Sequence, residues 1–127
     1  MVSMPRFVIL RHEMPPGSDR GTHFDLMIEA GGVLRTWSVP ELPAPGKLIH
    51  AEALPDHRLA YLDYEGPVSG NRGSVSRVDE GEYEVLADSA GLWHVRLAGK
   101  TLRGSLELRQ LEDSPSQWMA SFHSSVQ

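Results

Sequence analysis

The chain has 127 residues, with 12 basic and 17 acidic side chains, a formal net charge of −5 and no cysteine. Its length fits one domain, residues 1–127, that can bury a core without cross-links. The lack of cysteine excludes disulfides and thiolate metal sites and favours a reducing cytoplasm. The acidic balance argues against a protein that coats nucleic acid, and no apolar run is long enough to span a membrane.

Short runs of alternating apolar and polar residues, separated by glycine and proline, predict an all-β protein. Many short antiparallel strands at this spacing favour a compact closed β-barrel. The predicted strands, in chain order, are Arg6–Arg11, His23–Ala30, Val33–Val39, Lys47–Ala53, Leu59–Tyr64, Ser74–Val78, Glu82–Leu86, Leu92–Leu97, Ser105–Gln110 and Gln117–Phe122. A helical turn at Ala51–Leu59 is an alternative there, limited by Pro55.

Glycine-containing turns connect several of these strands. Ala30-Gly31-Gly32 predicts a hairpin, and Asp79-Glu80-Gly81 predicts another. Two longer segments, Glu13–Thr22 and Pro40–Gly46, are rich in proline and glycine and are predicted to be irregular loops. Functional groups commonly lie beside such loops on a rigid scaffold.

The strand His23–Ala30 carries the most informative pattern, because successive side chains on a strand face opposite sides. One face carries His23, Asp25 and Met27. An imidazole and a carboxylate two positions apart project side by side and can share a metal ion, although a solvated polar face is the alternative for such a pair alone. The other face joins the predicted interior, which contains Phe24, Leu26, Ile28, Leu34, Trp37, Val39, Trp93, Val95, Leu97, Leu106 and Leu108.

His12 strengthens the metal interpretation. It follows the strand Arg6–Arg11, and pairing of that strand beside His23–Ala30 brings His12 toward His23 and Asp25. Two imidazoles and one carboxylate form a set suited to Mn²⁺, Fe²⁺ or Zn²⁺, with open positions for water and substrate. Such a site can polarise a phosphoryl oxygen.

His57 and Tyr61 form a second candidate pair. They are four positions apart, so they share a face of the predicted strand. His57 is a candidate general acid or phosphate donor, and Tyr61 can donate its hydroxyl to the same phosphate. A surface histidine and a core tyrosine are the alternative.

Several short motifs follow one another in the order of a known family. They are Arg11-His12, His23-Phe24-Asp25-Leu26, Gly32–Pro40, Asp56–Gly66 and Arg77–Glu84. This arrangement resembles the 3′-phosphoesterase module of bacterial DNA ligase D and its free-standing relatives. The resemblance extends from Pro5 to Phe122.

The resemblance implies a β-barrel and a manganese-dependent enzyme of DNA end repair that removes a 3′-phosphate or a 3′-ribonucleoside. It implies that His12, His23 and Asp25 are the metal ligands, with Zn²⁺ as the alternative to Mn²⁺. His57 and Tyr61 match the family's phosphate-contacting residues. The expected catalytic set is therefore His57, Tyr61 and His12.

Three positions depart from the family's pattern. Met27 stands where the family has an arginine that grips the phosphate, Pro55 replaces an acidic residue and Glu41 replaces a lysine. Because Met27 shares a face with His23 and Asp25, it is expected to point into the site. A guanidinium binds phosphate and a thioether does not, so Met27→Arg is expected to restore a contact for which the pocket still has room.

Arg20, in the loop before His23, is a candidate replacement for the lost positive charge. The expected substrate-binding set is therefore Arg20, His57 and Tyr61. We expect a cytoplasmic monomer that acts on 3′ ends of DNA or RNA/DNA, with a ligase or an end-binding repair protein as a partner in trans.

Two alternatives remain open. One is a catalytically weakened or inactive relative that binds nucleic-acid ends or a protein partner, with Met27 marking the lost catalysis. The other is a metal-dependent enzyme for a different small phosphorylated substrate.

Overall fold

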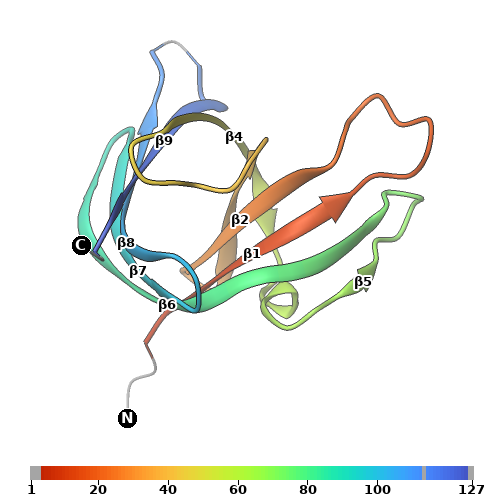
Figure 1. Cartoon of the computed structure of the whole chain (residues 1–127), viewed down its shortest axis with the longest axis horizontal. Helices are drawn as coiled ribbons and strands as arrows, with labels where there is room; N and C mark the ends of the chain where they lie inside the picture. The colour runs from red at the N-terminus through yellow and green to blue at the C-terminus, as the bar shows by residue number, and fades with distance from the viewer. Residues whose placement is uncertain (1–3, 113, 126–127) are drawn as a thin grey trace.

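The computed structural model describes residues 4–112 and 114–125, which form one antiparallel sheet (Figure 1). The strands are β1 (Arg6–Glu13), β2 (His23–Ala30), β3 (Val33–Val39), β4 (Leu48–His57), β5 (Gly66–Pro67), β6 (Ser74–Ser89), β7 (Leu92–Gly99), β8 (Arg103–Gln110) and β9 (Gln117–Ser124). They neighbour one another in the order β1-β2-β3-β4-β9-β8-β7-β6, and β6 also pairs with β1. The sheet thus closes into the predicted barrel, and β5 pairs with β6 outside the ring.

The hairpin between β2 and β3 is as predicted. Gly31 and Gly32 form its two-residue turn with φ values of 63° and 84°, which glycine adopts without steric strain. This turn sets the register, so that Asp25 lies opposite Ser38 and Met27 lies opposite Thr36. Residues 14–22 and 40–47, between the strands that they join, form no strand, which confirms the two irregular loops.

Strands β1 and β2 are apolar on both faces. Phe7 and Ile9 join the larger hydrophobic cluster, which draws on every strand of the ring and fills the barrel. Val8 and Leu10 join a smaller cluster on the outer face. The predicted interior is confirmed for Leu26, Ile28, Trp37, Val39, Trp93, Val95, Leu97, Leu106 and Leu108.

Of the other two residues of the predicted interior, Phe24 packs at the edge of the interior cluster and Leu34 lies outside it. Phe24 is only half-buried, because it sits near the start of β2 opposite the exposed Arg11, at the rim of the barrel. Leu34 is buried but belongs to the outer cluster. It lies an odd number of positions from Trp37, and such residues on a strand face opposite sides.

The hairpin predicted at Asp79-Glu80-Gly81 is wrong, because Ser74–Ser89 is one continuous strand, β6. The Gly81 φ value is not positive. A Cβ atom at this position would lie 2.0 Å from the Ala98 carbonyl oxygen, so the glycine permits close approach of β7. The buried Asp79 carboxylate accepts hydrogen bonds from the Thr101 and Leu102 backbone amides and so fixes the turn between β7 and β8.

The strand predicted at Leu59–Tyr64 is also wrong. Leu59–Leu62 is a short 3-10 helix, η1, with the Tyr61 amide donating to the Arg58 carbonyl at 3.1 Å. So short an apolar run does not distinguish a strand from a helical turn. The preceding strand β4 continues through Pro55 to His57, and the helical alternative for that stretch is not adopted.

Helix η1 covers the outer face of β1, β2 and β3. Leu62 is buried in the outer cluster, which consists of Val8, Leu10, Met27, Leu34, Leu62 and Val75. Two arginines hold the segment from outside: Arg6 Nη2 donates to Asp63 Oδ1 at 3.1 Å, and Arg77 Nη1 donates to the Leu62 carbonyl at 3.3 Å. The outer face is therefore a second packed layer.

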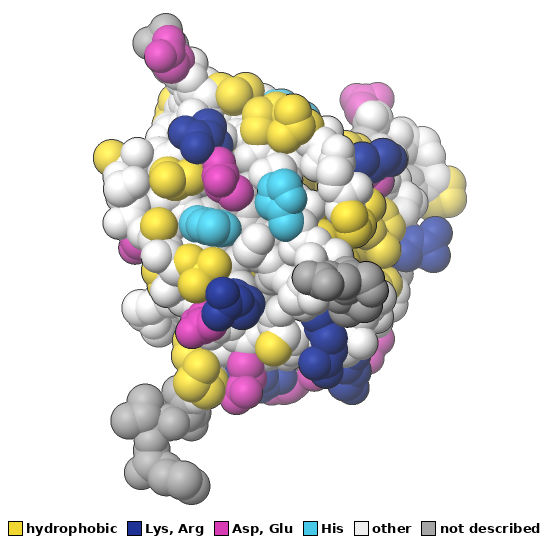
Figure 2. All heavy atoms as spheres, turned by 60° about the vertical axis from the view of Figure 1, so that its left-hand side comes forward, with side chains coloured by type: hydrophobic (Ala, Val, Ile, Leu, Met, Phe, Trp, Pro, Cys, Tyr) yellow, Lys and Arg dark blue, Asp and Glu magenta, His cyan; other side chains and the backbone are white. Residues whose placement is uncertain are grey.

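The opposite side of the barrel has a mixed surface. Basic and acidic side chains are interspersed on the face that Figure 2 shows. On strand β8, Arg109 pairs with Glu107 at 2.8 Å. The described part of this face has no continuous basic surface, in keeping with the acidic composition. Among the described residues no helix is long and apolar enough to cross a membrane.

Candidate metal centre

Three side chains from β1 and β2 meet on the outer face of the barrel. The pairing of these strands places His12 directly opposite His23, as expected from the sequence, and Asp25 lies two residues further on. The imidazole centroids of His12 and His23 are 4.7 Å apart. One ligand atom from each residue lies within 4.8 Å of the other two, so the group is able to hold a metal ion.

Backbone carbonyls fix the proton positions of both imidazoles. His12 Nε2 lies 2.6 Å from the Arg72 carbonyl oxygen, and His23 Nδ1 lies 2.9 Å from the Gly21 carbonyl oxygen. A carbonyl oxygen only accepts hydrogen bonds, so each of these nitrogens carries the hydrogen. In the neutral rings, His12 Nδ1 and His23 Nε2 therefore present lone pairs.

Both lone pairs point at the Asp25 carboxylate. His12 Nδ1 is 3.1 Å from Oδ2, and His23 Nε2 is 3.4 Å from Oδ1. His23 Nε2 and Asp25 Oδ1 are buried and have no hydrogen-bond partner. Buried polar atoms without partners are unfavourable, and a cation shared by all three residues removes that penalty. The donor set thus fits a divalent metal.

The electrostatics of the group point the same way. Interaction with the Asp25 carboxylate raises the pKa of His23 more than burial lowers it. Burial pushes the pKa of Asp25 upward, but the neighbouring imidazoles of His23 and His12 outweigh it and leave that pKa below its usual value. The site therefore favours a negative carboxylate beside positive charge, either as protons on the imidazoles or as a metal ion.

The loop after β5 completes the orientation of His12. Gly73 lies so close to β1 that a Cβ atom there would be 1.8 Å from the Glu13 carbonyl oxygen. This contact holds the adjacent Arg72 carbonyl against the His12 ring. Outer hydrogen bonds of this kind orient metal-binding histidines.

Arg20, the candidate substrate-binding residue, lies beside this group. Its Nη2 donates to Ser38 Oγ at 2.8 Å and lies 3.8 Å from Glu52 Oε1, and Ser38 is the strand partner of Asp25. The positive charge of Arg20 lowers the pKa of His23, but by less than Asp25 raises it. Arg20 and His23 line one cleft of about 350 Å³, together with Gly21, Thr22, Ser38, Pro40, His50 and Glu52.

His57 and Tyr61 form a separate group. Their ring centroids are 5.6 Å apart, although His57 ends β4 and Tyr61 lies in η1, so they do not share a strand face as predicted. His57 Nδ1 donates to the Pro55 carbonyl at 2.9 Å, which leaves Nε2 as the free nitrogen. Within the described residues no hydrogen bond, ion pair or ring contact joins this pair to the metal-binding group.

Met27 shares the face of His23 and Asp25, as predicted, but it does not open into the site. Its side chain is 1% exposed and packs in the outer cluster with Leu62 and Val75. The expected room for an arginine at this position is therefore absent. An arginine there would bury its charge among apolar side chains.

Several residues of the site were missed from the sequence. Ser38, His50 and Glu52 line the Arg20 cleft, and the alternation of β3 and β4 is the signal that would have placed them on the outer face. The carbonyls of Gly21 and Arg72 carry no sequence signal, since backbone groups are the same in every residue.

Comparison with known proteins shows which family this chain resembles. The model of the DNA Ligase D 3′-phosphoesterase domain matches residues 16–110. The chain is also 32% identical to the multifunctional non-homologous end joining protein LigD of Pseudomonas aeruginosa. That alignment covers 76% of this chain and 13% of the relative, so the chain is similar to a small part of a much longer protein.

Proposed function

The chain belongs to the DNA ligase D 3′-phosphoesterase domain family, and from that premise we propose that it is a metal-dependent phosphoesterase acting at the ends of DNA. The substrates are a 3′-phosphate or a 3′-ribonucleoside on DNA or RNA/DNA. The proposed metal is Mn²⁺, with Zn²⁺ as the alternative. Joining of the trimmed ends falls to a ligase or an end-binding repair protein acting in trans.

The convergence of lone pairs at His12, His23 and Asp25 carries this proposal. Two imidazoles donate their N–H hydrogens to backbone carbonyls. Their other ring nitrogens face the buried Asp25 carboxylate. These three residues would hold the metal. A divalent cation held there would polarise a phosphoryl oxygen of the substrate.

The other side chains bind the substrate and move its proton. Arg20 offers a guanidinium beside the metal ligands, and its long contact to Glu52 at 3.8 Å is easily exchanged for a phosphate. As the imidazolium, which carries a hydrogen on both ring nitrogens, His57 would donate its Nε2 proton to the leaving oxygen and keep the Nδ1 hydrogen bond to the Pro55 carbonyl. Tyr61 would donate its hydroxyl to the same phosphate.

An assay on defined DNA ends tests the proposal. Primer-templates that end in a 3′-phosphate or a 3′-ribonucleotide are incubated with Mn²⁺ and wild-type protein, His23→Ala or His123→Ala. We expect activity in the wild type, its loss in His23→Ala and its retention in His123→Ala, because His123 is an exposed residue of β9. Absence of 3′-end processing in the wild type would refute the enzymatic proposal.

One observation favours a second candidate function. Met27 occupies the position of the family's phosphate-binding arginine and is buried, so the chain is alternatively a non-catalytic protein that binds DNA ends. In that case wild type and Arg20→Ala both lack activity, yet the wild type still binds a 3′-phosphorylated oligonucleotide. If Arg20→Ala instead abolishes a measurable wild-type activity, the binding-only alternative is wrong.

A further inference from the structure

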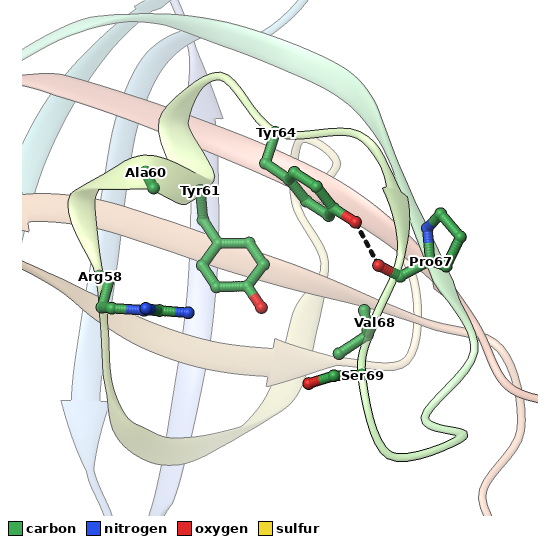
Figure 3. A pocket seen from close by; sticks show the side chains of 7 residues that line it. All are labelled: Arg58, Ala60, Tyr61, Tyr64, Pro67, Val68 and Ser69. Atoms are coloured by element: carbon green, nitrogen blue, oxygen red, sulfur yellow. Dashed lines mark hydrogen bonds between the residues drawn. The ribbon is translucent and has the colours of Figure 1, made fainter.

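A second hollow lies beside His57, between η1 and the segment that follows it. Its volume is about 240 Å³, and it is lined by Arg58, Ala60, Tyr61, Tyr64, Pro67, Val68 and Ser69 (Figure 3). This is below the roughly 300–1,000 Å³ of pockets that enclose a drug-sized ligand, so it suits a single ring system. We propose that this hollow binds the base of the nucleotide at the 3′ end of the nucleic-acid substrate.

The aromatic side chains of the hollow are unusually accessible for this protein. The chain has nine aromatic residues, all within the described residues, and of these only Tyr64 is exposed, at 38%. Tyr61 is half-buried beside it, with ring centroids 5.6 Å apart. Exposed tyrosine rings are stacking platforms for nucleobases.

The Tyr64 ring is held in place and is not a freely rotating surface side chain. Its hydroxyl donates to the Pro67 carbonyl, as Figure 3 shows. A Cβ atom at Gly66 would lie 3.3 Å from the Tyr64 hydroxyl oxygen, so the glycine permits this closure. A ring that is fixed before binding loses little conformational entropy when a base stacks on it.

The polar groups of the hollow lack partners within the protein. The Arg58 guanidinium and the Tyr61 hydroxyl make no hydrogen bond or ion pair with any described residue. In Figure 3 the Arg58 side chain runs alongside Tyr61. In a chain of net charge −5, an uncompensated cation beside two aromatic rings matches a base with its flanking phosphate better than it matches an apolar ligand.

The position of the hollow links it to the proposed chemistry. Tyr61 contacts both Tyr64 and the His57 ring, each with centroids 5.6 Å away. A base stacked in the hollow would therefore lie next to the proposed proton donor. This inference rests on the proposed function, because it takes a nucleic-acid 3′ end as the ligand.

Equilibrium binding without turnover tests the site. In EDTA, single-stranded DNA ending in 2-aminopurine is compared with the same strand ending in an abasic residue. We expect the wild type to bind the base-containing end about tenfold more tightly. Tyr64→Leu should abolish that preference, whereas Tyr64→Phe, which keeps the ring, should retain most of it.

A surface variant keeps the test valid if Tyr64→Leu fails to fold. Arg58→Gln removes a side chain without partners and should weaken binding of both strands, with a smaller salt dependence. Equal wild-type affinity for the two ends, or an unchanged preference in folded Tyr64→Leu, would overturn the proposal. A base preference without Mn²⁺-dependent activity would refute only the enzyme, and activity without a base preference would refute only this base site.

Discussion

The two groups of candidate residues are held in place in different ways. His12, His23 and Asp25 project from neighbouring strands of the closed barrel, in a register that six paired positions define. His57 and Tyr61 lie at the end of β4 and in η1, a four-residue 3-10 helix packed on the outside. The first group is part of the scaffold, and the second is attached to it.

This difference predicts how each group responds to change. The strands of the metal-binding group are anchored in the barrel's interior, because their other face carries Phe7, Ile9, Leu26 and Ile28. Helix η1 depends on one buried side chain, Leu62, and on exposed ion pairs such as Arg6–Asp63. Exposed ion pairs contribute little stability. The second group should therefore move or open without unfolding of the barrel.

The largest expected effect separates the two scaffolds directly. Leu26→Ala should lower the free energy of unfolding by about 2–5 kcal/mol, because it leaves a cavity in the packed barrel. Leu62→Ala should lower it less, since the outer cluster is smaller and η1 can shift to fill the space. Urea unfolding of both variants measures this. Equal losses would show that η1 is as integral to the fold as β2.

The same contrast explains what the sequence could predict. Alternation in β2 correctly placed His23, Asp25 and Met27 on one face, and adjacency of β1 correctly brought His12 to them. Alternation is a local property of each strand and is legible in the sequence. The closed barrel followed similarly from the number and spacing of short strands.

The failures concern features that tertiary contacts decide. Nothing local in Asp79-Glu80-Gly81 distinguishes a turn from a strand in which Gly81 admits a neighbouring carbonyl. The 3-10 form of η1 depends on packing of Leu62 against the outer cluster. Burial of Met27 depends on the same packing. Alternation in β2 therefore predicted the face of Met27 correctly, but not that Leu62 covers its side chain.

The next prediction concerns the loop that orients His12. Gly73→Ala forces a Cβ atom against the Glu13 carbonyl and should displace the Arg72 carbonyl from His12. We expect roughly a 10–100-fold loss of Mn²⁺ or Zn²⁺ affinity, as is typical when a metal-binding histidine loses its outer partner. Titration calorimetry measures the affinity.

Gly17→Ala is the matched control for this variant. Gly17 has a similar φ of 84°, but nothing lies within 4 Å of a Cβ atom there. Gly17→Ala therefore introduces the same backbone strain as Gly73→Ala, but its Cβ atom meets no neighbouring atom. Unchanged metal affinity in both variants would mean that the Arg72 carbonyl does not orient His12.

The smallest expected effect is the pH dependence of the metal-binding group. In the metal-free protein, the raised pKa of His23 contributes stability that is present below 6.5, its usual value, and is lost as the pH rises through the raised value. The lowered pKa of Asp25 contributes stability that is present above 3.8 and is lost as the pH falls through the lowered value. The metal-free pair should therefore stabilise the fold most between these limits.

Metal binding should show the opposite trend above pH 6. Ligand imidazoles must be neutral, so the stabilisation that Mn²⁺ or Zn²⁺ adds should grow as the pH rises through the histidine range. Thermal unfolding with and without metal, at a series of pH values, separates the two contributions. His23→Gln should lose the pH-dependent metal effect, while His123→Ala should keep it. A metal-induced rise in Tm that is the same at every pH would show that the ion does not bind through these imidazoles, which must lose a proton to become ligands.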